Sequence, residues 1–283
     1  MNMEEYSSGR RGVTRNLVGW VTGARVQIPS PPPSSLYPLG GMGFFVPRAC
    51  GCGDKTQKER LALLNLLEDY IYASLPRRGD FSTNPNLSNK VDGQGNFRPF
   101  YGNTTVFLLD DKIKQALGTI QAGLYRAAWS MLAQPLDPAT FHMTLHDLVN
   151  GPKTDADLLG RMEKAEQGAK KLLESWKQEP EISMKATALF NMVNTSVVLG
   201  LAPANSNSME RLDKMYMALE QVVPLGYTMT PHITMAYFKP GTYSQEQLQH
   251  LAAALGSVQL EVELNMEKLV LQTFADMNHY ENV

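Results

Sequence analysis

The sequence FHMTLHDL at residues 141–148 decides the fold class, because PHITMAYF at residues 231–238 repeats its pattern. Each stretch places a His and a Thr two positions apart between apolar residues or proline. Side chains of a β-strand alternate between the two faces, so His and Thr share one face while Met143 or Ile233 enters the core. Each of two separate strands is therefore predicted to present an imidazole and a hydroxyl together.

The composition is that of a globular protein without a strong charge. The 283 residues are enough for two domains or one larger bilobal unit. They are 43% hydrophobic and 19% charged, and the net charge is −2. This charge disfavours wrapping of duplex DNA, and no apolar run is long enough to predict a membrane span. Cys50 and Cys52 are too few for a structural zinc. These features, with no secretory signal, predict a cytoplasmic protein.

Residues 1–54 differ from residues 55–283. They contain the Pro-Ser run at residues 29–35 and show no helical or strand periodicity, which predicts a linker or disordered extension without chemistry. Residues 26–29 read VQIP, which the T-arm consensus of a transfer RNA gene would encode if it were translated. We therefore hypothesise that Met42 is the true start and that residues 1–41 are not translated.

From Lys55 onward, the apolar periodicity predicts alternating helices and strands. Helices are expected at about 55–75, 111–132, 155–177, 209–223 and 244–255, and strands at 104–109, at the two His stretches, at 186–201 and at 261–274. Ser208 is the expected cap of the fourth helix, Ser244 with Gln247 forms a capping box, and the 186–201 stretch is one strand or a hairpin about Asn194. Both halves thus read strand, helix, His strand, helix, which predicts two similar α+β lobes that each donate one His-x-Thr near their junction.

Two imidazoles and two hydroxyls suit transfer at phosphorus. In-line cleavage of a phosphodiester needs a base on the nucleophile and an acid on the leaving oxygen, on opposite sides of the phosphorus atom. Because His titrates near pH 6.5, one imidazole can accept a proton while the other donates one. The Thr hydroxyls can donate hydrogen bonds to the non-bridging oxygens, and this chemistry requires neither metal nor cofactor.

The paired motifs His142-Met143-Thr144 and His232-Ile233-Thr234 resemble the signature of the 2H phosphoesterase superfamily, which includes RNA ligase-like and 2',3'-cyclic phosphodiesterase enzymes. Residues 102–106 and 274–277 are similar to an uncharacterised branch of it, and the resemblance covers about residues 90–280. It implies a bilobal α+β fold with pseudo-twofold symmetry, in which two antiparallel sheets flanked by helices surround a central cleft. It also implies catalysis by His142 and His232 and phosphate binding by Thr144 and Thr234. Which His is acid and which is base stays open.

Neighbouring residues are weaker candidates. His146 continues the strand parity of His142, so it is a candidate cleft residue, and the alternative is a surface His beyond the strand end. His142 and His146 also have the spacing of a zinc-binding His-Glu-x-x-His, but Met143 stands where the general base should be. Asn103 and Tyr101, at a turn entering the first strand, are candidates for contacting a base or sugar; alternatively Asn103 only closes the turn. Parity places Tyr237 in the core.

The sequence therefore predicts a cytoplasmic, monomeric hydrolase that opens 2',3'-cyclic phosphates or cleaves 2'-5' phosphodiester linkages of nucleotides or RNA ends. A non-catalytic module that grips a nucleotide or RNA end with the same residues is the alternative.

Overall fold

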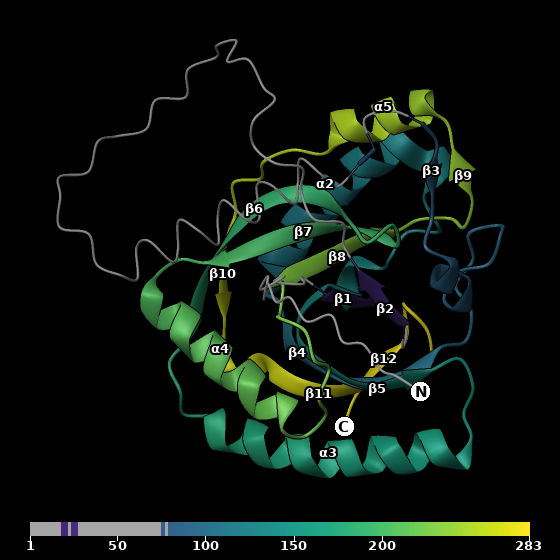
Figure 1. Cartoon of the computed structure of the whole chain (residues 1–283). Coiled ribbons are helices and arrows are strands. Elements are labelled where there is room, and N and C mark those ends of the chain that lie inside the picture. The colour runs from purple at the N-terminus through teal and green to yellow at the C-terminus, as the bar shows by residue number, and fades with distance from the viewer. Residues whose placement is uncertain (1–17, 22–23, 28–74, 77–78) are drawn as a thin grey trace, which may run out of the picture.

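The computed structural model describes residues 18–21, 24–27, 75–76 and 79–283 (Figure 1). The helix expected at 55–75 and the proposed start at Met42 lie outside these residues, Leu75 excepted. Within the N-terminal extension, β1 (Val18–Val21) and β2 (Ala24–Gln27) pair as an antiparallel hairpin. The expectation of a linker or disordered extension over residues 1–54 stays a prediction.

Eight strands form one antiparallel sheet, which curves strongly in Figure 1. Its order is β10 (Glu261–Leu264), β6 (Ile182–Met192), β7 (Ser196–Pro203), β8 (His232–Tyr237), β5 (His142–Gly151), β4 (Tyr101–Leu108), β11 (Leu269–Phe274) and β12 (Tyr280–Asn282). A separate small sheet pairs β3 (Phe81–Ser82) with β9 (Thr242–Tyr243). The two His-x-Thr strands, β5 and β8, are thus neighbours at the middle of the large sheet.

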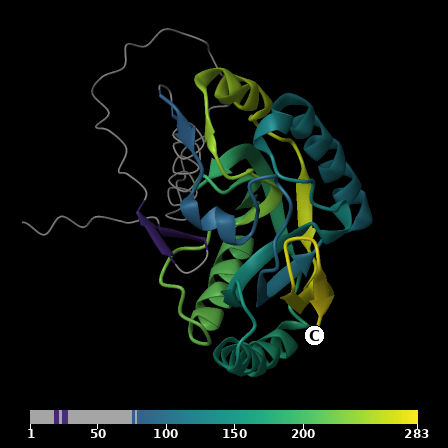
Figure 2. The same cartoon turned by 90° about the vertical axis from the view of Figure 1, so that its right-hand side faces the viewer.

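In the part of the chain that the structure describes, four α-helices pack in two pairs. They are α2 (Asp111–Ala128), α3 (Ala156–Trp176), α4 (Ser206–Glu220) and α5 (Gln245–Ala254), with short 3₁₀ turns at Pro85–Asn89, Trp129–Met131, Pro138–Thr140 and Met266–Lys268. Helix α2 packs on α5 and α3 packs on α4, and Figures 1 and 2 show the two pairs at opposite ends of the sheet. Helix α2 connects β4 to β5, and α4 connects β7 to β8 in the same way.

The sheet consists of two equivalent halves. Strands β8, β7, β6 and β10 of one half correspond in order to β5, β4, β11 and β12 of the other. The predicted bilobal α+β fold with pseudo-twofold symmetry is confirmed. The two predicted sheets are these two halves, and they join where β5 and β8 pair through Met143 and Ile233.

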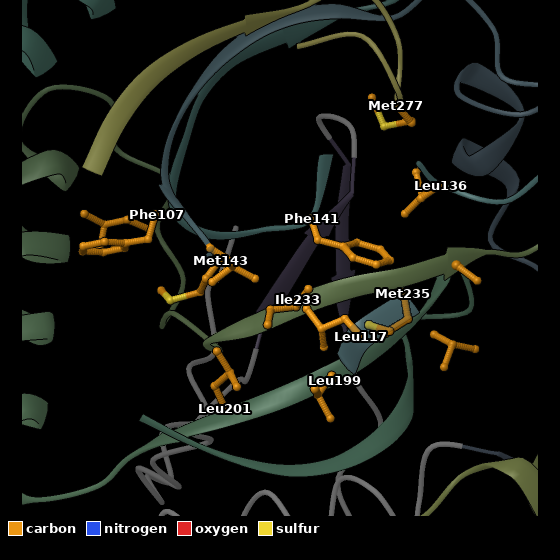
Figure 3. Close-up of a cluster of buried hydrophobic side chains, with 14 of the residues drawn as sticks. Phe107, Leu117, Leu136, Phe141, Met143, Leu199, Leu201, Ile233, Met235 and Met277 are labelled. Carbon is orange, nitrogen blue, oxygen red and sulfur yellow. The ribbon is translucent and has the colours of Figure 1, made fainter. Parts of the chain in front are cut away.

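The core lies directly behind this junction. Met143 and Ile233 are fully buried, and Figure 3 shows them beside Phe107, Leu199 and Leu201. The apolar members of both motifs therefore pack into one continuous core, as the alternation predicted. Full burial of each such side chain contributes about 1.5–3 kcal/mol.

Turns and helix caps agree with the sequence pattern at two places and differ from it at a third. The 186–201 stretch is a hairpin, with a tight turn at Val193 and Asn194, whose φ angles are 47° and 59°. The capping box at Ser244 is present. The prediction that Ser208 caps α4 is wrong. The helix begins earlier, and the Asn205 side chain caps it by accepting a hydrogen bond from the Ser208 backbone N–H.

The prediction of one continuous closing strand at 261–274 is also wrong. The Asn265 side chain accepts a hydrogen bond from the Glu267 backbone N–H and starts a 3₁₀ turn there. This turn breaks the strand into β10, which pairs with β6, and β11, which pairs with β4. The C-terminal stretch thus contributes one strand to each half of the sheet.

Candidate active site

The pairing of Met143 with Ile233 brings the two motifs together. Because β5 and β8 are antiparallel, a pair at these central residues sets His142 beside Thr234 and Thr144 beside His232. All four of these side chains are half-buried and alternate with the fully buried Met143 and Ile233. We call the sheet face that carries them the motif face. Two imidazoles and two hydroxyls thus share one face.

Both imidazoles are held in the same way. The ring Nδ1 of His142 lies 2.7 Å from the carbonyl oxygen of Thr140, and that of His232 lies 2.7 Å from the carbonyl oxygen of Thr230. A carbonyl oxygen only accepts, so Nδ1 must carry the proton in each ring. In the neutral form each ring therefore keeps a bare Nε2, and no described residue forms a hydrogen bond with either Nε2.

The environment favours the neutral form of both rings. Burial lowers the pKa of His142 to about 4; the Thr140 carbonyl and the Asp147 charge oppose this, while His232 and Lys114 add to it. Burial also lowers the pKa of His232, against the Thr230 carbonyl and Asp147. At pH 7 the free protein therefore holds two neutral imidazoles side by side.

A β-bulge follows the Thr of each motif. On β5, Thr144 pairs with Val106 and His146 with Thr105, so Leu145 is the extra residue. On β8, Thr234 pairs with Val198 and Ala236 with Val197, which makes Met235 the extra residue at the equivalent position. A bulge of this kind reverses the alternation of side chains beyond it.

The reversal changes which residues reach the motif face. Beyond the bulges, Asp147 on β5 and Tyr237 on β8 take the parity of the motif His and Thr residues, and both are half-buried. The Asp147 charge helps to raise the pKa of Tyr237, after burial, so the two groups lie within electrostatic reach of one another. Parity without the bulges predicts Tyr237 in the core; the structure leaves its side chain half-buried and packed against the core.

Comparison with known proteins bears on the fold. No protein-family model and no curated protein matches the chain. A conserved protein of unknown function from Agrobacterium tumefaciens has a similar structure, with a TM-score of 0.54 at 19% identity over 76% of this chain and 96% of its own. This similarity shows that the two chains share a fold. Two further similar structures are a Thermus thermophilus protein (TM-score 0.43, 13% identity, 64% and 94% of the two chains) and Escherichia coli LigT complexed with 3'-AMP (0.41, 12%, 65% and 94%).

Within this fold, His146 does not reach the motif face. The residue is 1% exposed, its Nε2 lies 3.0 Å from Oε1 of Glu220 on α4, and its ring centroid lies 5.1 Å from that of Tyr216. The bulge at Leu145 is the reason, because it turns His146 toward the helices. His142 and His146 therefore lie on opposite faces, and they do not form the His pair of a metalloprotease site.

Each crossover helix braces the segment ahead of the motif that follows it. The Glu220 carboxylate, besides contacting His146, accepts hydrogen bonds from the backbone N–H groups of Leu225 (2.9 Å) and Gly226 (3.1 Å). On α2, the buried Gln121 amide donates to the carbonyl oxygens of Leu136 and Met235, both at 3.1 Å. Both helices thus also contact the motif strand of the other half.

Asn103 and Tyr101 also lie away from the motif face. The Asn103 amide is 1% exposed; it donates to the carbonyl oxygen of Met162 on α3 (2.9 Å) and accepts from the Val149 backbone N–H (3.1 Å). Tyr101 has the same strand parity and packs against the core. The Asn103 amide thus ties β4 and β5 to α3 on the face away from the motif His and Thr residues.

Other residues near the motif face were missed by sequence reasoning. The Tyr280 ring centroid lies 5.0 Å from that of His142, in an edge contact. Lys90 places its Nζ 4.9 Å from the Phe100 ring centroid and 5.7 Å from that of Tyr237, and burial lowers its pKa against the Asp147 charge. These residues come from segments far apart in the chain, and no local pattern marks them.

Neither a metal cluster nor a membrane helix is found in the part of the chain that the structure describes. No group of three or more His, Cys, Asp or Glu side chains there is arranged to hold a metal ion. None of the described helices is long and apolar enough to cross a bilayer.

Proposed function

We propose that the chain is a phosphodiesterase that hydrolyses 2',3'-cyclic phosphates or 2'-5' linkages of nucleotides or RNA ends. The observation that carries the proposal is the pairing of Met143 with Ile233, which sets two identically anchored imidazoles and two hydroxyls on one face. A phosphorus atom between the imidazoles would meet a base on one side and an acid on the other.

The reaction balances with the groups on this face. One neutral imidazole accepts a proton from water at Nε2 as the water oxygen attacks phosphorus. The bond from phosphorus to the leaving sugar oxygen breaks, and that oxygen takes a proton from Nε2–H of the other imidazole, which is protonated. The hydroxyls of Thr144 and Thr234 donate hydrogen bonds to the non-bridging oxygens, where negative charge is held.

Binding of the substrate anion favours protonation of the imidazole that acts as the acid. Both imidazoles are neutral in the free protein because burial lowers their pKa values. An anionic phosphodiester beside them favours the charged form and raises these pKa values again. Binding of the substrate anion and of one proton are therefore expected to be coupled.

An aromatic environment supports a nucleotide rather than a bare sugar phosphate. Tyr280 touches the His142 ring by its edge, and Tyr237 lies on the same face. Stacking of one base on an aromatic ring contributes about 1–3 kcal/mol to binding. The rings are thus candidates for the part of the site that holds a base.

A panel of 2',3'-cyclic nucleoside monophosphates and 2'-5' oligonucleotides, assayed with EDTA present, tests the proposal. We expect turnover by the wild type, and loss of turnover in His142→Ala and His232→Ala. His250→Ala, on the exposed surface of α5, is the matched control. Nucleotide binding without turnover would favour the binding module, and loss of turnover on adding EDTA would contradict the metal-free reaction.

A further inference from the structure

We infer that Asp147 is a positioning residue for the two motif imidazoles: its carboxylate keeps a proton available to them at the expense of binding the substrate anion. The inference deepens the proposed function and rests on it. Asp147 lies outside both His-x-Thr motifs, and only the bulge at Leu145 turns it toward them.

The placement of Asp147 is fixed by the strand register. It pairs with Thr104 on β4, whose hydroxyl oxygen lies 3.4 Å from Asp147 Oδ1. The residue is half-buried and shares the motif face with His142 and His232. Among the described residues its carboxylate forms no ion pair, although its charge acts on Lys90 and raises the pKa of that side chain against the effect of burial.

The charge of Asp147 acts on both imidazoles and on the groups around them. It opposes the lowering of the pKa of His142 and of His232, and among the described residues no other carboxylate acts on both. The groups facing His142 besides Asp147 are His232, Lys114 and Tyr280. The other titratable groups that sense Asp147 are Lys90, His146, Tyr216, Tyr227, Tyr237 and Tyr280.

A carboxylate at this place has two opposite effects. It favours the imidazolium that the leaving oxygen needs, which raises kcat at neutral pH. It also repels the phosphodiester anion, which raises KM. A residue with only a structural role would not separate kcat from KM in this direction.

Asp147→Asn separates these effects, because the Asn side-chain oxygen still accepts from Thr104 while the charge is removed. We expect kcat at pH 7.5 to fall roughly tenfold and KM to fall as well, with activity recovering toward lower pH. Asp147→Glu keeps the charge and should restore the wild-type profile. Asp157→Asn, on the exposed face of α3 where Asp157 pairs with Arg161, is the matched control.

A measurement without turnover keeps this inference separate from the proposed reaction. The ring protons of His142 and His232 are titrated by NMR, with and without inorganic phosphate, after assignment with His→Gln variants. Asp147→Asn should lower the pKa of both rings by roughly one, while Asp147→Glu and Asp157→Asn leave them unchanged. Asp147→Ser replaces the Asn variant if that variant does not fold.

Titration curves that coincide between the wild type and Asp147→Asn would overturn the role of Asp147, whatever the activity. If the wild type turns over no phosphodiester, the proposed function fails, and the titration still decides whether Asp147 controls the two imidazoles. A rise in KM with unchanged kcat in Asp147→Asn would likewise overturn the inference.

Discussion

The strands β5 and β8 carry the same motif, but their residues beyond the motif differ. In both, a backbone carbonyl two residues before the His holds its Nδ1, and a bulge comes directly after the Thr. Past the bulge, β5 has His146 and Asp147 where β8 has Ala236 and Tyr237. Under the proposed function, the shared features act on one phosphodiester from both halves, and the differences give each half a separate task.

The largest expected effect tests whether the two halves act on one phosphorus atom. His142→Ala or His232→Ala should each reduce kcat/KM by about 10²–10⁴, because each removes one proton transfer. The double variant should lose little more than the worse single one, since both transfers belong to one step. Fully additive losses would show that the two strands do not act together.

The next effect concerns the hydroxyls. Thr144→Val and Thr234→Val keep the shape of the side chain but remove the donor, and each should reduce kcat by about 10²–10³. Equal losses would mark the two halves as equivalent toward the phosphate. A loss at only one Thr would instead sharpen the difference between β5 and β8, whereas unchanged kcat in both would contradict their role.

The pH dependence tests the coupling between substrate and proton. The limb of kcat/KM that falls as pH rises reports the acid in the free protein, where burial lowers the pKa of both imidazoles. The same limb of kcat reports the complex, in which the phosphodiester raises that pKa. The falling limb of kcat should therefore lie at higher pH than the falling limb of kcat/KM, by about one pH unit or more. Coinciding limbs in the two profiles would contradict the coupling.

The buried contact between His146 on β5 and Glu220 on α4 should matter for stability. His146→Ala removes the buried partner of Glu220 and should lower the free energy of unfolding by about 2–3 kcal/mol, measured by urea denaturation. Thr228→Ala, on the exposed loop ahead of β8, is the control and should change it little. The equivalent position on β8 is already Ala236, so the comparison asks whether only one half needs this contact.

A last effect, small within any one pH unit, is the dependence of stability on pH. The folded pKa of His142 is about 4, below the unfolded value near 6.5, so the unfolded chain binds this proton first as pH falls. Stability should therefore decrease from about pH 6.5 toward pH 4, by at most about 1.4 kcal/mol per pH unit for one proton. In His142→Gln this part of the slope should disappear, and an unchanged slope would contradict the buried neutral state.

Much of this architecture could be predicted from the sequence, because short sequence patterns determine local structure through neighbouring residues alone. A His and a Thr two positions apart keep one face in any strand, so the four motif side chains were placed correctly on one face. The repeated order of strand, helix and His strand predicted the two halves. The capping box at Ser244 depends on neighbours only, and it was found for the same reason.

The errors arise where alternation is interrupted. An extra residue in a strand has no characteristic side chain, and Leu145 and Met235 are as apolar as any strand residue, so nothing in the sequence marks the bulges. The side-chain parity expected for His146 and Tyr237 is reversed because both residues lie beyond those bulges. Asp147 was missed for the same reason, and Lys90 and Tyr280 because only tertiary folding brings them near the motifs.

The bulge at Leu145 also makes this region sensitive to a change in chain length rather than in chemistry. Gain of one codon on the facing strand, between Thr105 and Val106, would give Leu145 a partner, restore regular alternation and exchange the places of His146 and Asp147. Such a variant would keep both His-x-Thr motifs unaltered while carrying a carboxylate in its interior.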